Sequence, residues 1–307
     1  MDANGPLIKN FSYDRIHRVR TEKQVQKLAK TILVTGANGY IGQKVVEQLL
    51  NLGVNVLAAD LIIDGIDPRA DRLQVNLFEN PEKITKRIDQ IDVCLHLAWR
   101  NGFNHFANSH IDDLPGHFHF ISSLLEAGLK HIAVQGTMHE VGYWEGIIDE
   151  NTPTNPISYY GIAKNALRQV TALMAKKKNA TFQWLRAYYI LGDDKRNHSI
   201  FTKILEAEER GDATFPVTTG KNSFDFIEVD ELAHQIALVI TQSDVTGVIN
   251  TCSGKATALR EKVEEFIATR HLNIKPQFGV FPDRPYDSPI VYGDNTKIQR
   301  IIAAGQK

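Results

Sequence analysis

The sequence predicts an α/β protein: a Rossmann-type, doubly wound parallel sheet with a small C-terminal substrate-binding domain. Two observations lead to this prediction. From Thr31 onward, short apolar runs alternate with segments of helical spacing, which is the pattern of a parallel sheet covered by helices on both faces. A glycine-rich turn joins the first apolar run to the first helical segment, where a Rossmann domain binds phosphate.

Six apolar runs are the expected strands, and helices are expected between them. The strands are expected at 32–35, 54–59, 93–98, 131–135, 182–190 and 247–251, and the helices at 41–51, 84–89, 118–127 and 163–175. After Gly192 the alternation becomes looser, with a return to the sheet expected around 226–229 and 248–250. We therefore expect an NAD(P)-binding domain of residues 31–192 plus 226–254 and a substrate-binding domain of residues 193–225 plus 255–307.

Residues 1–30 precede the first convincing strand and form an N-terminal extension. They contain seven Lys or Arg residues against three acids. Thr21 with Gln24 three positions later is typical of a capping box. We interpret the extension as a tail that carries one short helix packed on the body.

The overall composition gives no reason to expect a nucleic-acid or membrane partner. The 307 residues are 43% hydrophobic and 23% charged, with a formal net charge of -1, so no polyanion is attracted globally. No run approaches the ~20 apolar residues that span a bilayer. Two cysteines, Cys94 and Cys252, are too few for a disulfide framework and lie in apolar runs. We expect a cytoplasmic protein with no metal site.

The segment ILVTGANGYIG places Gly36, Gly39 and Gly42 between a strand and a helix. The first glycine allows the tight turn, the second lets backbone approach a pyrophosphate, and the third lets helix and strand pack closely. The positive end of the helix then points at the phosphates. We predict a dinucleotide cofactor, with these contacts: Gly36, Asn38, Gly39, Tyr40, Ile41, Gly42, Asp60, Leu77, Ala98, Tyr160 and Lys164.

Asp60 ends the second expected strand, 24 residues after Gly36. A carboxylate there accepts hydrogen bonds from both adenosine ribose hydroxyls and repels a 2′-phosphate. This favours NAD as the cofactor. Arg69 and Arg72 follow closely enough to reach a phosphate, so NADP stays open.

Tyr160 and Lys164 are four residues apart and share one face of the expected helix. A phenol ionises near pH 10, and a nearby ammonium, together with the positive nicotinamide ring of an oxidised cofactor, favours the phenolate. The phenol can then exchange a proton with a carbonyl or alcohol oxygen. Tyr159 lacks the four-residue spacing to Lys164, so we expect Tyr160 and not Tyr159 to be the acid/base.

The glycine spacing together with PISYYGIAK resembles the extended short-chain dehydrogenase/reductase family, in its NAD-dependent epimerase/dehydratase group. Further landmarks follow in order: HLAW, QGTMHEVG, LRAYYILG and FDFIEVDELA. The resemblance is nearest to sugar-nucleotide 4-ketoreductases and 4-epimerases. It implies that Tyr160 is the acid/base, that Lys164 tunes it and holds the nicotinamide ribose, and that Thr137 orients the substrate oxygen. It also implies a homodimer formed partly by the helix that carries Tyr160.

The sequence also departs from the family in ways that bear on the substrate. Related 4,6-dehydratases have Asp and Glu where this chain has Met138 and His139, so we expect no elimination of water. His139 is expected to hydrogen-bond the sugar or to act as a base in an epimerisation. Tyr189 and Phe224 replace an Asn and an Arg that contact the nucleotide sugar, whereas Arg284 resembles the Arg that grips the diphosphate. The expected substrate-binding residues are Trp99, Met138, His139, Tyr189 and Arg284, with Asn104 and His105 near them.

The sequence therefore predicts an NAD(P)-dependent enzyme that transfers hydride at C4 of a nucleotide-linked 4-keto-6-deoxy hexose. A 4-epimerase with retained NAD is the alternative, because it uses the same catalytic residues. A non-catalytic NAD(P) sensor is a third interpretation, and it needs the glycines but not the Tyr–Lys pair.

Overall fold

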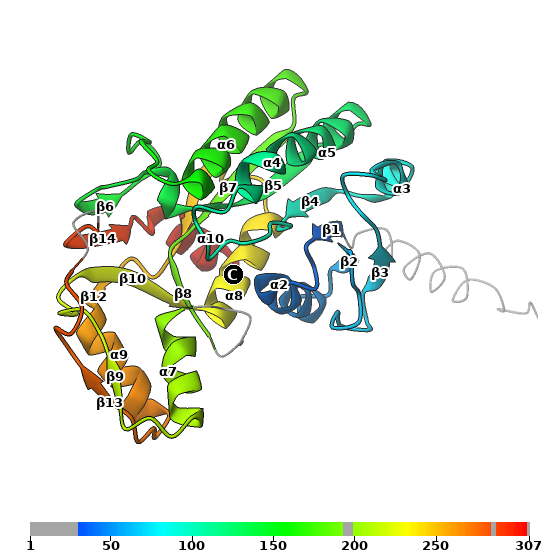
Figure 1. Cartoon of the computed structure of the whole chain (residues 1–307). Coiled ribbons are helices and arrows are strands. Elements are labelled where there is room, and N and C mark those ends of the chain that lie inside the picture. The colour runs from blue at the N-terminus through cyan, green and yellow to red at the C-terminus, as the bar shows by residue number, and fades with distance from the viewer. Residues whose placement is uncertain (1–29, 193–198, 284–286, 306–307) are drawn as a thin grey trace, which may run out of the picture.

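In the computed structural model, residues 30–192, 199–283 and 287–305 are described. Within them, seven strands form one sheet in the order β11-β7-β5-β4-β1-β2-β3 (Figure 1). Every neighbouring pair in it is parallel. The strands are β1 (Thr31–Thr35), β2 (Asn55–Asp60), β3 (Asp71–Gln74), β4 (Val93–His96), β5 (His131–Thr137), β7 (Thr181–Ala187) and β11 (Gly247–Thr251). This order is that of a Rossmann sheet, and the predicted fold class is confirmed.

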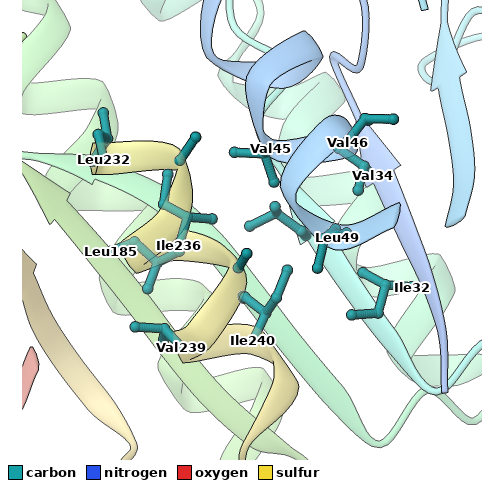
Figure 2. Packing of buried hydrophobic residues seen from close by; sticks show 14 of the residues in the cluster. Ile32, Val34, Val45, Val46, Leu49, Leu185, Leu232, Ile236, Val239 and Ile240 are labelled. Atoms are coloured by element: carbon teal, nitrogen blue, oxygen red, sulfur yellow. The ribbon is translucent and has the colours of Figure 1, made fainter. Parts of the chain in front are cut away.

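Helices cover both faces of this sheet, so its strands are buried, apart from the largely exposed edge strand β3. One face carries α2 (Tyr40–Asn51), α8 (Val229–Thr241) and α10 (Thr296–Gly305). Figure 2 shows Val45 and Leu49 of α2 facing Ile236 and Ile240 of α8 above Ile32 of β1. The other face carries α3 (Glu82–Thr85), α5 (Leu114–Glu126) and α6 (Tyr159–Lys177), with the short elements η1 (Ile88–Gln90), α4 (Ser109–Asp112) and η2 (Met138–Glu140) in the connections.

A smaller sheet packs beside the first, in the order β12-β10-β14-β6, with β8 paired to β10. Its strands are β6 (Gly146–Ile148), β8 (Tyr189–Leu191), β10 (Ser223–Glu228), β12 (Ala256–Ala258) and β14 (Ile290–Gly293). Beyond it, α7 (Ile200–Glu209) and α9 (Leu259–Thr269) share an apolar cluster, next to the paired strands β9 (Thr214–Pro216) and β13 (Lys275–Gln277). These elements form the smaller body at the lower left of Figure 1.

The arrangement of strands differs from the sequence prediction in several places. The strand expected at 182–190 is interrupted at Tyr188: β7 stays in the large sheet and β8 joins the small one. The return to the large sheet expected at 226–229 is wrong, because β10 pairs with β8, β12 and β14. Only from Val229 does the chain rejoin the large body, as α8.

The C-terminal helix also lies elsewhere than expected. The sequence predicts that residues 255–307 belong to the substrate-binding domain, but Ile298 and Ile301 of α10 are buried in the core beside the large sheet and α8. The extension before residue 30 lies outside the described residues. No helix in the described part of the chain is both long enough and apolar enough to cross a membrane.

Candidate active site

The turn between β1 and α2 has a shape that only small residues permit. Gly36 has φ +68°, and a Cβ on it would lie 2.6 Å from the backbone nitrogen of Ala98. A Cβ on Gly42 would overlap the carbonyl oxygen of Gly36. The turn therefore lies against the loop after β4, and the first amides of α2 lie at the carboxyl edge of the sheet, where Rossmann domains bind phosphate.

Asp60 lies next to this turn, at the end of β2. One carboxylate oxygen accepts a hydrogen bond from the Asn38 amide at 2.8 Å, and the other accepts one from the Leu61 amide at 2.7 Å. Arg69 is held elsewhere: it donates to Asp67 and to Asn51 at the far end of α2. The turn and Asp60 thus fit a dinucleotide whose ribose carries no 2′-phosphate.

The other expected cofactor contacts surround the same edge. Ala98 lies against Gly36, and the Tyr40 hydroxyl lies where a Cβ on Gly192 would be. Ile41 packs against the core beneath α2, and Leu77 is buried on the opposite face of the sheet. Contact between these side chains and a cofactor stays a prediction.

Tyr160 and Lys164 lie in the first turns of α6, which begins after Ser158. The Ser158 hydroxyl accepts a hydrogen bond from the Gly161 amide at 3.2 Å and caps the helix. Lys164 is 2% exposed, and its ammonium donates to the carbonyl oxygen of Gln135 at 2.8 Å. Burial lowers the pKa of Lys164 to about 7, against an opposing effect of the Glu140 carboxylate.

Thr137, the last residue of β5, completes the expected catalytic group. Its hydroxyl is a hydrogen-bond partner of the Tyr160 hydroxyl. Burial raises the pKa of Tyr160, and the bond from Thr137 only partly opposes this. Burial therefore keeps the Tyr160 phenol protonated in the protein without cofactor. The structure brings Thr137, Tyr160 and Lys164 together, as the sequence predicts.

Glu140 is a buried carboxylate beneath Thr137 that the sequence analysis missed. One of its oxygens accepts from the Thr137 amide and from the Trp184 indole, each at 2.7 Å. The other lies 3.3 Å from Nε of Arg168 and 3.6 Å from Arg186. We call these four residues, Glu140, Arg168, Trp184 and Arg186, the carboxylate cluster. The spacing of Thr137 and Glu140, three residues apart, is that of a capping box and is visible in the sequence.

The loop after β4 forms the opposite wall of the site. The His105 carbonyl accepts a hydrogen bond from the Tyr160 amide at 3.0 Å, and the His105 ring stacks on the Tyr160 ring with 5.2 Å between centroids. The His105 ring also lies 4.2 Å from that of His139. Burial lowers the pKa of His139 to about 3, so His139 is a neutral hydrogen-bonding group at physiological pH.

The expected substrate-binding residues do not all gather at one surface. Tyr189 lies 6.3 Å from His139 and 4.4 Å from Phe224, between ring centroids. Met138 is 6% exposed and packs in an apolar cluster with Tyr188 and Phe224. Arg284 lies outside the described residues. For Met138, His139 and Tyr189, contact with a substrate stays a prediction.

These residues meet at the carboxyl edge of a parallel sheet whose first turn fits a dinucleotide. The molecule is therefore a dinucleotide-dependent enzyme of the Rossmann class. More narrowly, the chain belongs to the NAD-dependent epimerase/dehydratase family, whose model matches residues 32–252.

One characterised relative and two solved structures are similar to this chain over most of its length. The chain is 46% identical over 269 residues to dTDP-6-deoxy-L-talose 4-dehydrogenase (NAD(+)) of Aggregatibacter actinomycetemcomitans, which covers 85% of this chain and 98% of that protein. Its fold matches UDP-N-acetylglucosamine 4-epimerase of Methanobrevibacter ruminantium with a TM-score of 0.77 at 20% identity, over 89% of this chain and 92% of that one. The UDP-glucose 4-epimerase of Thermus thermophilus in complex with NAD gives 0.72 at 18% identity, over 90% and 93%.

Proposed function

We propose that this enzyme transfers hydride between NAD and C4 of a dTDP-linked 6-deoxyhexose, interconverting the 4-hydroxy and 4-keto sugars. The observation that carries the proposal is the meeting of Thr137, Tyr160 and Lys164 beside the glycine turn. The 46% identical relative, a 4-dehydrogenase of this kind, supports the choice of sugar and of NAD.

The residues divide the reaction between them. NAD, when bound, accepts or supplies the hydride. Tyr160 gives its hydroxyl proton to the C4 oxygen during reduction and takes that proton back during oxidation. Thr137 hydrogen-bonds the same oxygen and holds it beside Tyr160. The Lys164 ammonium favours the ionised form of Tyr160. His139, being neutral, is available to hydrogen-bond the sugar.

The proposal is tested with purified enzyme, dTDP-6-deoxy-L-talose and NAD, by following the absorbance of NADH. We expect NADH to accumulate with the 4-keto sugar. Tyr160→Phe should lower kcat by about 10²–10⁴-fold at unchanged melting temperature, whereas Tyr159→Phe, on the exposed side of the same turn, should behave as the parent. Conversion between C4 epimers without net NADH, on cofactor that copurifies, would instead establish the epimerase.

The preference for NAD rests on Asp60. We expect kcat/KM for NAD to exceed that for NADP, because a 2′-phosphate would meet the carboxylate and Arg69 is engaged with Asp67. Asp60→Ser should lower the ratio of kcat/KM for NAD to kcat/KM for NADP, because the variant should use NADP better. Equal use of both cofactors by the parent would contradict this assignment.

We also propose a homodimer formed through the outer faces of α5 and α6. Ile162 and Leu173 are 43% and 69% exposed and lie on one face of α6, since eleven residues make just over three full turns. Phe118 of α5, the helix that packs beside α6, is also exposed. Leu173→Asp should yield a monomer by light scattering; a parent enzyme that is already monomeric would contradict the proposal. Residence in the cytoplasm stays a prediction.

A further inference from the structure

Two side chains, His117 and Lys164, lie against the indole of Trp99. The His117 ring stacks on it with 4.3 Å between centroids and 12° between planes. The Lys164 ammonium lies 3.9 Å from the centroid of the indole. Contact of Trp99 with substrate stays a prediction.

The plane of the indole is fixed by hydrogen bonds at its edge. Trp99 Nε1 donates to His110 Nδ1 at 3.0 Å. Because an indole N–H can only donate, the proton of neutral His110 is on Nε2, which donates to the Asn104 carbonyl at 2.9 Å. His110 is 1% exposed, and it ties Trp99 to the loop whose His105 carbonyl holds the Tyr160 amide.

The stacked histidine is held as firmly as the indole. His117 Nδ1 is 2.9 Å from His96 Nε2, and His96 Nδ1 is 2.8 Å from the Thr35 hydroxyl. Burial lowers the pKa of both histidines, so the ring stacked on the indole and the ring behind it are neutral. We call Trp99 with His96, His110 and His117 the histidine cluster.

We propose that Trp99 is a positioning residue for Lys164: its indole face holds the ammonium beside Tyr160 and favours the charged form of the lysine. The inference rests on the proposed function, in which the Lys164 ammonium favours the ionised form of Tyr160. A cation over an aromatic face is attracted by the ring quadrupole, and most strongly when the cation is desolvated. Lys164 is desolvated, and burial brings its pKa to about 7, where a modest attraction changes the fraction that is charged.

Other groups around Lys164 set the background against which Trp99 acts. The Glu140 carboxylate raises the pKa of Lys164. Tyr160 lies one turn earlier on α6, with its ring centroid 6.0 Å from the ammonium. His96 and His117 are neutral, and the Gln135 carbonyl accepts a hydrogen bond from the ammonium. A substitution of Trp99 keeps all of these groups, so the contribution of the indole to the pKa of Lys164 can be measured separately.

The test is the pH profile of kcat for Trp99→Leu and Trp99→Phe, beside Phe103→Leu as a control on an exposed ring of the same loop. We expect activity to fall at alkaline pH, when Lys164 loses its proton. We expect the leucine variant to shift this limb downward by about one pH unit, so that the loss of kcat is greater at pH 8 than at pH 6. Phenylalanine keeps a ring face, so the alkaline limb of Trp99→Phe should stay close to its position in the parent enzyme.

A second readout needs no substrate. The carbon next to the Lys164 amine can be titrated by NMR in protein with labelled lysine, the signal being assigned by its absence in Lys164→Met. A lower pKa in Trp99→Leu supports the proposal even if dTDP-6-deoxy-L-talose proves not to be a substrate. An unchanged Lys164 pKa, or a loss of kcat that is equal at every pH and equal for leucine and phenylalanine, would overturn it.

Discussion

The carboxylate cluster and the histidine cluster support the same catalytic pocket from two sides, with opposite chemistry. Beneath the neutral hydroxyl of Thr137 lie ionised groups, Glu140 with Arg168 and Arg186. Beside the charged Lys164 lie neutral rings. A carboxylate next to Lys164 would bind its ammonium in an ion pair, whereas a ring face attracts it without using its three N–H donors. Lys164 therefore stays able to donate to a ribose.

The largest effect is expected from removing the charge at the centre of the carboxylate cluster. Glu140→Ala leaves Arg186, which is 1% exposed, without its counter-ion. Losing one partner of a buried ion pair costs about 3–5 kcal/mol of unfolding free energy. Urea unfolding measures this loss, with the exposed Glu126→Gln as the control. A loss no larger than that of the control would mean that the cluster does not hold β5 and α6 together.

The histidine cluster should respond to pH. Because burial lowers the pKa of His96 to about 3 and that of His117 further, both stay neutral in the fold but gain protons in the unfolded chain below pH 6.5. Their contribution to stability is therefore complete above about pH 6.5 and falls, as pH is lowered, by about 1.4 kcal/mol per pH unit for each ring.

The variant His117→Phe tests this assignment. It should make the decline in stability between pH 6.5 and pH 5 shallower by one proton, as measured by urea unfolding at several pH values. The exposed His119→Asn should leave the slope unchanged. An unchanged slope in the His117 variant would show that His117 is already protonated in the fold.

The smallest effect is expected at the edge of the carboxylate cluster. The Arg168 side chain is 20% exposed, and Glu140 keeps Arg186 when Arg168 is removed. Arg168→Met should therefore cost about 1 kcal/mol of unfolding free energy, and Arg168→Lys less. A loss of unfolding free energy in Arg168→Met as large as that in Glu140→Ala would contradict this, because it would mean that Arg186 does not compensate for the loss of Arg168.

Local spacing predicts the parts of the site that are local in the chain. The glycine turn, Asp60 and the pair Tyr160 and Lys164 each depend on a few neighbouring residues, and the structure places them at one edge of the sheet. The histidine cluster is different, since His96, His110 and His117 come from β4, α4 and α5. Each looks unremarkable in its own segment, and the tertiary fold brings them to Trp99.

The same reasoning explains the errors in the fold. β3 has the sequence DRLQ and is largely exposed, so it shows no apolar run and was not predicted. β10 reads as a buried strand, which the sequence reveals, but which sheet it joins depends on partners far along the chain. The sequence does not predict the break between β7 and β8 at Tyr188, because the apolar run continues across that residue.

The pairing of β6 with β14 has a consequence for synthesis. β6 ends at Ile148 and β14 begins at Ile290, so β6 leaves the ribosome roughly 140 residues ahead of its partner. At typical elongation rates the nascent chain then waits on the order of ten seconds. β11 and α10, which complete the large body, also emerge late. A chain stopped before β14 therefore has every strand of the large sheet, but it lacks β14 of the small sheet and the helix α10 that packs on the large one.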